Sequence, residues 1–165
     1  GKKFRPRLIA EYRNNGKALE YYAEVCGKLS SLLGYQYGIT YVPHDATQRE
    51  LIAGISRFTA MYNLGFNPMQ LPKAGVLDGI QVVRTLLGFL EFDSTLDFII
   101  TAIQNYRKKK DEKLGVYLNS PVHDEHSHPA DALRYLAMGL KYYFPDDNLV
   151  YEPQKYYNHS SGFDV

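Results

Sequence analysis

Strand-like runs alternate with helix-period segments along the 165 residues, and this alternation restricts the fold more than any other feature. Residues 37–42 (YGITYV) form a compact β-branched run bounded by glycine and proline, which is typical of a buried strand. Residues 17–33 repeat apolar side chains with a helical period and are followed by Gly34, a common helix C-cap. Strands that alternate with helices predict the α/β class.

The same patterns assign the rest of the chain. Further strands are predicted over residues 4–12, 66–71 and 114–118, and further helices over residues 48–64, 76–87, 94–107 and 130–143. Asp93 or Ser94 is the expected cap of the helix 94–107. Residues 145–165 are rich in tyrosine, asparagine, aspartate and serine. The sequence therefore predicts one domain over residues 1–144 and an irregular tail over residues 145–165.

Composition places the chain among soluble globular proteins, with 45% apolar and 22% charged residues. The net charge of +1 is nearly neutral, so any affinity for nucleic acid must come from a local patch. Cys26 is the only cysteine, which excludes a disulfide framework and indicates a reducing cytoplasm. No apolar run approaches the ~20 residues of a membrane span, so no membrane partner is expected.

Residues 120–135 (SPVHDEHSHPADALRY) combine three histidines, three carboxylates and two prolines in a turn that becomes a helix. Pro129 suits the first helical turn, with Ser127 or His128 as the N-cap. Asp131 then lies near the positive end of the helix dipole, and His128 precedes it by three residues on roughly the same face. This pair is either ordinary complementation of the dipole or half of a divalent-metal site.

The histidines allow another interpretation of this stretch. His123, Asp124, His126 and His128 could ligate zinc, although no cysteine pair or HExxH spacing supports a dedicated site. The histidines could equally belong to a solvated loop.

Asp45 is the second carboxylate of interest. It follows the predicted strand 37–42 in the sequence PHD, and ligands collect at the carboxyl ends of strands in open α/β sheets. An N-cap or an Asx turn before the predicted helix 48–64 is the alternative.

The run 107–113 (RKKKDEK) is the only dense positive patch in the sequence. Such a run usually indicates a solvated helix end. Contact with nucleic acid is the more specific functional interpretation. Its basic residues are Arg107, Lys108, Lys109, Lys110 and Lys113.

Five stretches together carry a resemblance to a known family: YRNNGKALEYYAEV, YVPHDATQREL, DGIQVVRTLL, NYRKKKDE and SPVHDEHSHPADALRY. They resemble the C-terminal nuclease domain of the large terminase subunit of tailed bacteriophages, and the pairing of PHDA with SHPADALRY is specific. The resemblance implies an RNase H-like fold, a mixed sheet flanked by helices. It also implies endonucleolytic cutting of concatemeric viral DNA during genome packaging.

The resemblance implies roles for particular residues. Asp45 and Asp131 fall on metal-ligand positions, His128 on the histidine beside the last acid, and Asp124 on an acid of the preceding HD. Asp45, Asp131 and His128 would then be the catalytic residues of a phosphodiester hydrolysis that two Mg²⁺ or Mn²⁺ ions assist. The basic residues of the run 107–113 would hold double-stranded DNA without reading its sequence.

The resemblance also implies partners and a location. The expected partners are the terminase ATPase domain in the full-length chain, the portal and the small terminase subunit. The expected location is the host cytoplasm, transiently at the procapsid portal, and not the mature virion.

One departure from the family pattern concerns the first metal-binding aspartate. Family domains begin with a strand that bears it, and no aspartate precedes Asp45 here. The phosphate-binding GxxxxGK[ST] loop of the ATPase half is absent too. The chain is therefore expected to be N-terminally incomplete, and inactive or weakly metal-binding by itself. Two other functions stay open, a non-catalytic RNase H-like interaction module and a zinc-binding protein that uses the histidines between His123 and His128.

Overall fold

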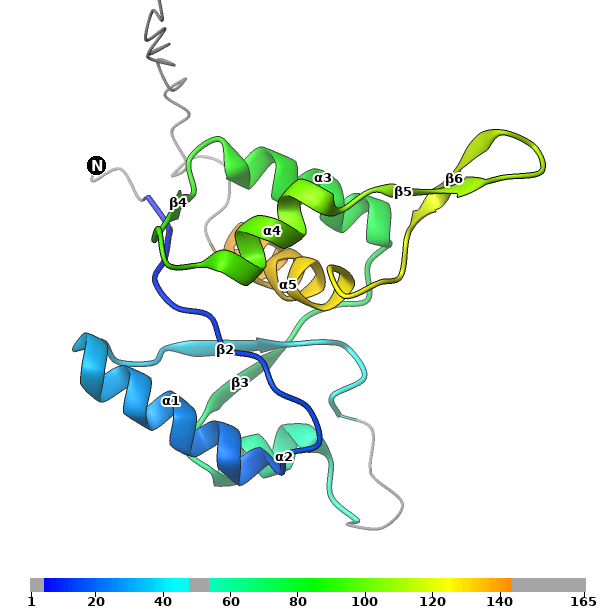
Figure 1. Ribbon diagram of the computed structural model, residues 1–165. Coiled ribbons are helices and arrows are strands. Elements are labelled where there is room, and N and C mark those ends of the chain that lie inside the picture. Colours follow the sequence, from blue (N-terminus) through cyan, green and yellow to red (C-terminus); the bar gives the residue numbers. More distant parts are fainter. Residues whose placement is uncertain (1–4, 48–53, 144–165) are drawn as a thin grey trace, which may run out of the picture.

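The computed structural model describes residues 5–47 and 54–143 (Figure 1). The elements in these ranges are β1 (Arg7–Leu8), α1 (Leu19–Leu33), β2 (Ile39–Val42), α2 (Arg57–Asn63), β3 (Asn67–Gln70), α3 (Val76–Leu87), β4 (Glu91–Phe92), α4 (Asp97–Asn105), β5 (Lys108–Asp111), β6 (Val116–Pro121) and α5 (Ser127–Tyr143). This mixture confirms the predicted α/β class. A membrane-crossing helix, which would have to be long and apolar, is not found in the described ranges.

The strands of the described residues pair two by two. β2 runs parallel to β3, with Ile39 opposite Asn67 and Val42 opposite Gln70. β1 runs parallel to β4, and β5 forms an antiparallel hairpin with β6. Parallel strands need a crossover connection, which explains why helices separate the members of the first two pairs along the chain.

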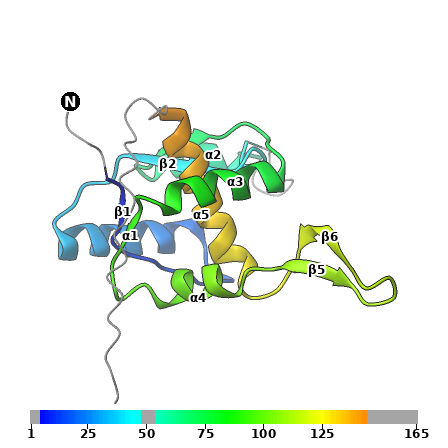
Figure 2. The ribbon, with the colours of Figure 1, turned by 90° about the horizontal axis from the view of Figure 1, so that it is seen from above.

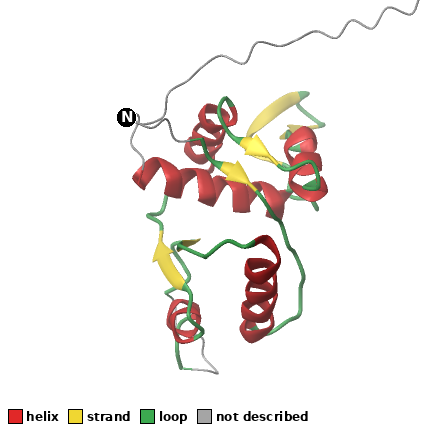
Figure 3. Cartoon of the chain, turned by 90° about the vertical axis from the view of Figure 1, so that its left-hand side faces the viewer, coloured by secondary structure: helices red, strands yellow, loops and turns green. Residues whose placement is uncertain are grey.

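Helix α5 is the element around which the described chain packs. It contacts α3 and α4 on one side and β2 on the other (Figure 1). Figure 3 shows the same grouping from the side, with α1, α2 and the β2–β3 pair apart from the other helices. Apolar side chains from α3, α4, α5 and the loops on either side of β4 form the buried core, which consists of Leu86, Leu90, Leu96, Ile99, Leu133 and Ala137.

Two glycines allow α5 to approach its neighbours closely. A Cβ atom at Gly139 of α5 would lie 2.5 Å from ring carbons of Tyr41 in β2. A Cβ atom at Gly79 of α3 would lie 2.6 Å from Cγ and Cδ of Arg134 in α5. Close-packed interiors have no room for such atoms, so both positions need glycine.

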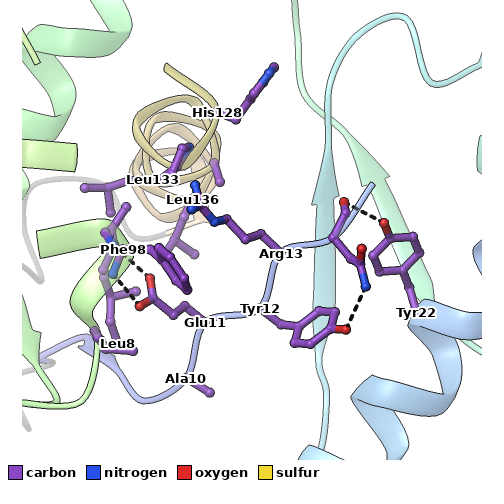
Figure 4. A pocket seen from close by; sticks show the side chains of 15 residues that line it. Leu8, Ala10, Glu11, Tyr12, Arg13, Tyr22, Phe98, His128, Leu133 and Leu136 are labelled. Atoms are coloured by element: carbon purple, nitrogen blue, oxygen red, sulfur yellow. Dashed lines mark hydrogen bonds between the residues drawn. The ribbon is translucent and has the colours of Figure 1, made fainter. Parts of the chain in front are cut away.

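The extended segment after β1 is fixed to the start of α4 by one side chain. Oε1 of Glu11 accepts a hydrogen bond from the backbone N–H of Phe98 at 2.7 Å, and Oε2 accepts from Ile99 at 2.8 Å. The guanidinium of Arg13 lies 3.9 Å from the centre of the Phe98 ring (Figure 4). A carboxylate from a distant segment therefore satisfies two of the amides that this helix leaves free at its start.

This long-range cap corrects one sequence prediction. Asp93 and Ser94 do not cap α4, because the N-cap residue is Leu96, which makes no side-chain capping bond. Asp93 instead accepts hydrogen bonds from the backbone and hydroxyl of Thr95, and it pairs with Arg7 at 3.2 Å. These contacts lower the pKa of Asp93, and the hydrogen bond from the Thr95 hydroxyl contributes most.

Other predicted boundaries shift as well. The predicted strand 4–12 is reduced to β1, and the described part of the predicted helix 48–64 begins at Arg57, after the N-cap Ser56. The basic run 107–113 is not a helix end, because α4 stops at Asn105 and the lysines belong to the β5–β6 hairpin. The predicted tail over residues 145–165 lies outside the described residues.

We predict opposite effects for two glycine-to-alanine substitutions in helices. Gly139→Ala should lower the free energy of unfolding by about 1–3 kcal/mol, because the added methyl overlaps the Tyr41 ring. The methyl added by Gly27→Ala in α1 meets no atom within 4 Å. This substitution should raise the free energy of unfolding by about 0.5–1 kcal/mol, because alanine has the higher helix propensity. Urea denaturation of both variants measures the difference. A Gly139→Ala variant as stable as the parent would mean that α5 does not approach β2 this closely.

We also predict that Glu11→Ala destabilises the domain by about 1–2 kcal/mol, because two helix amides lose their acceptor. Amide hydrogen exchange at Phe98 and Ile99 should accelerate in this variant. Glu24→Ala removes an exposed carboxylate from α1 and serves as the control, with an expected change within about 0.5 kcal/mol. Equal exchange rates at Phe98 in both variants would contradict the cap.

Candidate functional site

The acidic start of α5 is the turn with Asp124 and Glu125 that immediately precedes the helix, and Asp124 and Ser127 hold it in place. The backbone N–H of Asp124 donates to Oγ of Ser127 at 2.9 Å, and this hydroxyl donates to the carbonyl of Val122 at 3.2 Å. Oδ1 of Asp124 in turn accepts from the backbone N–H of His126 at 3.0 Å. Helix α5 begins at Ser127, so Ser127 and His128, the two residues predicted as its N-cap, both lie inside its first turn. Asp124, a predicted metal ligand, therefore has a structural task as well.

Asp124 also meets a predicted DNA contact. Its Oδ2 lies 3.3 Å from Nη1 of Arg107, and the carbonyl of Arg107 accepts from the backbone N–H of Val122 at 3.0 Å. These contacts attach the base of the β5–β6 hairpin to the start of α5. The fold thus brings together two residues that were predicted to bind opposite charges.

Asp131 is paired within its own helix. It does not lie in the first turn as predicted, because α5 begins at Ser127 and its first turn contains no acidic residue. Oδ1 of Asp131 accepts from Nε of Arg134 at 3.2 Å and from Nη2 at 3.0 Å. The Arg134 side chain is only 9% exposed, whereas that of Asp131 is 39% exposed. Asp131 therefore balances a buried positive charge, and only Oδ2 takes no part in these two bonds.

Tyr106 is a member of the site that sequence reasoning missed. Burial raises its pKa above the ordinary 10.0, as does the negative charge of Asp131, with a smaller contribution from Asp124. The positive charge of Arg134 opposes these effects. Both carboxylates are therefore close enough to act on one phenol, which stays neutral. One tyrosine among fifteen, placed just after a helix, carries no signal in the sequence.

The histidines of this stretch do not converge on one point. The rings of His123 and His128 lie edge to face with centroids 5.8 Å apart. His126 faces Glu125, with 3.7 Å between Nε2 and Oε1. His128 also lines a cavity of about 510 Å³ between α5, α4 and the extended segment after β1 (Figure 4). That cavity is mainly apolar, with Glu11 and Arg13 among its polar members.

Asp45 lies, as predicted, directly after the carboxyl end of β2, in an exposed turn. The side-chain amide of Gln70, at the end of β3, donates to the carbonyl of His44 and to Oγ1 of Thr47. This amide fixes the turn on both sides of Asp45. The N-cap of α2 is Ser56, so Asp45 does not cap that helix.

The fit of these residues to divalent cations is partial. Asp45 and Oδ2 of Asp131 are hard oxygen donors of the kind that Mg²⁺ and Mn²⁺ prefer. Across residues 5–47 and 54–143, however, no group of three or more His, Cys, Asp or Glu side chains is placed to hold a metal ion. The described residues by themselves therefore complete neither a two-cation site nor a zinc site.

The predicted DNA-binding lysines lie together on the β5–β6 hairpin. Lys108, Lys109 and Lys110 are exposed along β5, and Lys113 is exposed in the turn. The hairpin extends away from the helices (Figures 1 and 2). The fold and site thus define an α/β protein in which a basic hairpin adjoins the acidic start of a helix. No family model, curated protein or solved structure compared with the chain matches it.

We predict that Asp131→Asn lowers the free energy of unfolding by about 1–3 kcal/mol, because the charge of Arg134 is left unbalanced inside the protein. The double variant Asp131→Asn with Arg134→Met should recover most of this loss, since an apolar chain of similar length needs no partner. Urea denaturation of the three proteins checks both effects. Equal stability of parent and single variant would show that the pair contributes nothing.

Asp131→Asn should also lower the pKa of Tyr106, because it removes the negative charge that helps to raise it. The raised pKa means that the contribution of Tyr106 to stability is fully present below pH 10.0 and is lost as the pH rises through the folded value. Without the Asp131 charge, this alkaline loss should shrink. Carbon-13 NMR titration of the tyrosine ring measures the pKa, with Tyr106→Phe to assign the signal and Glu24→Gln as the charge control.

Proposed function

We propose that this chain is part of a metal-dependent DNA endonuclease that cuts concatemeric double-stranded DNA during viral genome packaging. The observation that carries the proposal is the Arg107–Asp124 pair at 3.3 Å, which joins a basic hairpin to the acidic start of α5. A surface suited to phosphates and carboxylates suited to cations are thereby neighbours. The resemblance of PHDA and SHPADALRY to terminase nuclease domains supports the same function.

The finer architecture belongs to this proposal too. We infer an RNase H-like arrangement, supported by the parallel β2–β3 pair with α5 packed against β2. Asp45 at the end of β2 and Asp131 on α5 would be two of the carboxylate ligands for Mg²⁺ or Mn²⁺, and His128 would stand beside the second. The remaining ligands have to come from groups outside this set, since the described carboxylates do not complete a site.

The partners and the location follow from the same proposal. The chain would act with the terminase ATPase domain, the small terminase subunit and the portal, in the host cytoplasm and transiently at the procapsid. Cutting of packaged DNA needs no base-specific contact, and exposed lysines on a hairpin suit contact with the phosphate backbone.

A second candidate function is a non-catalytic interaction module of the same packaging complex. It is favoured by helix α1, which buries none of its residues and leaves Leu32 80% exposed. The exposed side chains of Leu33, Tyr35 and Tyr37 follow it in the chain. An apolar surface of this kind often marks a protein interface.

Manganese binding and plasmid nicking test the proposal together. Electron paramagnetic resonance of Mn²⁺ should show binding that weakens at least about tenfold in Asp45→Asn and in Asp131→Asn. His123→Ala should leave Mn²⁺ affinity unchanged, because that ring belongs to the zinc alternative. Nicking of supercoiled plasmid by this chain in millimolar Mn²⁺ should be feeble at most, because the described carboxylates do not complete a site.

Two outcomes would contradict the proposal. Unchanged Mn²⁺ affinity in Asp45→Asn would remove that residue from the site. The absence of Mn²⁺ binding in the parent protein would favour the interaction module, because weak binding is expected even from an incomplete site. Circular dichroism on every variant separates lost binding from lost folding, which matters most for Asp131→Asn.

A further inference from the structure

The β5–β6 hairpin is anchored at its base and through contacts of β6 with α3, and most of its side chains are exposed. Its base is held by the Val122–Arg107 backbone bond and by the Arg107–Asp124 ion pair. Beyond that point it extends from the helical body as a two-stranded ribbon (Figures 1 and 2). Such an arm can enter a concave partner that the body cannot.

The tip of the hairpin has a fixed shape. Oδ1 of Asp111 accepts from the backbone N–H groups of Lys113 at 2.9 Å and Leu114 at 3.1 Å. The carbonyl of Asp111 accepts from Gly115 at 2.8 Å, and Gly115 has a φ of 67°, which favours glycine. This turn holds Leu114 in solvent, where it is 73% exposed.

Apolar and basic side chains lie next to each other on the ribbon. Lys110 is directly opposite Tyr117, so the two side chains share one face. Tyr117 is 67% exposed, and Lys110 is exposed as well. The register shifts along the ribbon: Lys108 pairs with Pro121 and Lys110 with Tyr117, so four residue positions of β6 span the same length as two of β5. An irregularity of this kind bends a ribbon and increases its twist.

The charge of the arm selects a polyanion as its partner. The run 107–113 holds five basic and two acidic side chains, a net charge of +3, in a chain whose total is only +1. A two-stranded β-ribbon fits the major groove of B-form DNA, which is about 12 Å wide. Lysines along one strand can then reach phosphates while the tip reaches base edges.

We propose that the β5–β6 hairpin inserts into the major groove of duplex DNA, with Leu114 and Tyr117 making apolar contacts inside the groove and Lys108, Lys109 and Lys110 contacting the phosphates. The inference rests on the proposed function for its choice of duplex DNA as the partner. It is tested by binding and not by cleavage, so the two can fail separately.

The lysine contribution is measured by the salt dependence of binding. Fluorescence anisotropy with a labelled duplex, over a range of salt, gives the slope of log K against log salt. The Lys108→Gln, Lys109→Gln, Lys110→Gln triple variant should flatten this slope by about 0.9 for each phosphate that is no longer neutralised. A control triple variant, Lys28→Gln, Lys73→Gln, Lys141→Gln, removes the same charge from exposed sites elsewhere and should change the slope far less.

The apolar contribution is measured at fixed salt. Leu114→Ser with Tyr117→Ser should weaken duplex binding about tenfold and leave the salt slope unchanged, because apolar area is removed and the charge stays the same. The control is Leu32→Ser with Tyr62→Ser, a pair that is 80% and 68% exposed and so matches the tip in type and exposure. A major-groove ligand such as methyl green should compete with the parent protein, and a minor-groove ligand should not.

Three results would overturn the inference. The first is equal salt slopes for the two lysine triple variants. The second is duplex affinity unchanged by the tip substitutions. The third is binding to anionic phospholipid vesicles that depends on the tip while duplex binding does not. Hairpin-dependent duplex binding by a protein that binds no Mn²⁺ would leave the inference standing and remove the endonuclease. Nicking that is unchanged in both hairpin variants would do the reverse.

Discussion

The burial of the Arg134 guanidinium against Asp131 is the interaction on which the packing of this molecule most depends. Arg134 lies in the helix that contacts α3, α4 and β2, and its stem occupies the space that Gly79 leaves open. A buried cation is tolerated only with a partner, so Asp131 is bound to it by the fold itself. Any cation ligated by Asp131 must share that carboxylate with Arg134, which weakens the negative charge available to the metal.

Asp124 is likewise a candidate metal ligand that is already paired with an arginine. Arg107 and Asp124 neutralise each other, although one suits a phosphate and the other a cation. A cation that took Oδ2 of Asp124 would free Arg107 for DNA, and a phosphate that took Arg107 would free Asp124. The two proposed binding steps would then favour each other, because linkage between sites is reciprocal. The base of the hairpin is where this coupling would act.

Local signals predict the helices well, and contacts between distant residues account for what they miss. Helix α3 runs over the predicted residues, and α1 ends at Gly34 with a φ of 71°, as a C-cap glycine should. The cap of α4 comes from Glu11, about 87 positions away, which no local pattern reveals. The lysine run resembles a helix end in the sequence because its defining partners lie across the ribbon on β6. The Asp131–Arg134 pair, by contrast, is spaced three residues apart and could have been predicted.

The candidate carboxylates are therefore not equivalent, and this difference decides what each can reveal about chemistry. Asp124 caps a turn and pairs with Arg107, and Asp131 pairs with a buried arginine. Substitution of either changes folding and ligand binding together. Asp45 is exposed in a turn that Gln70 holds through His44 and Thr47, not through the Asp45 carboxylate. A loss of cation binding in Asp45→Asn would thus report on the cation alone, whereas the same loss in Asp131→Asn would first have to be separated from a loosened α5.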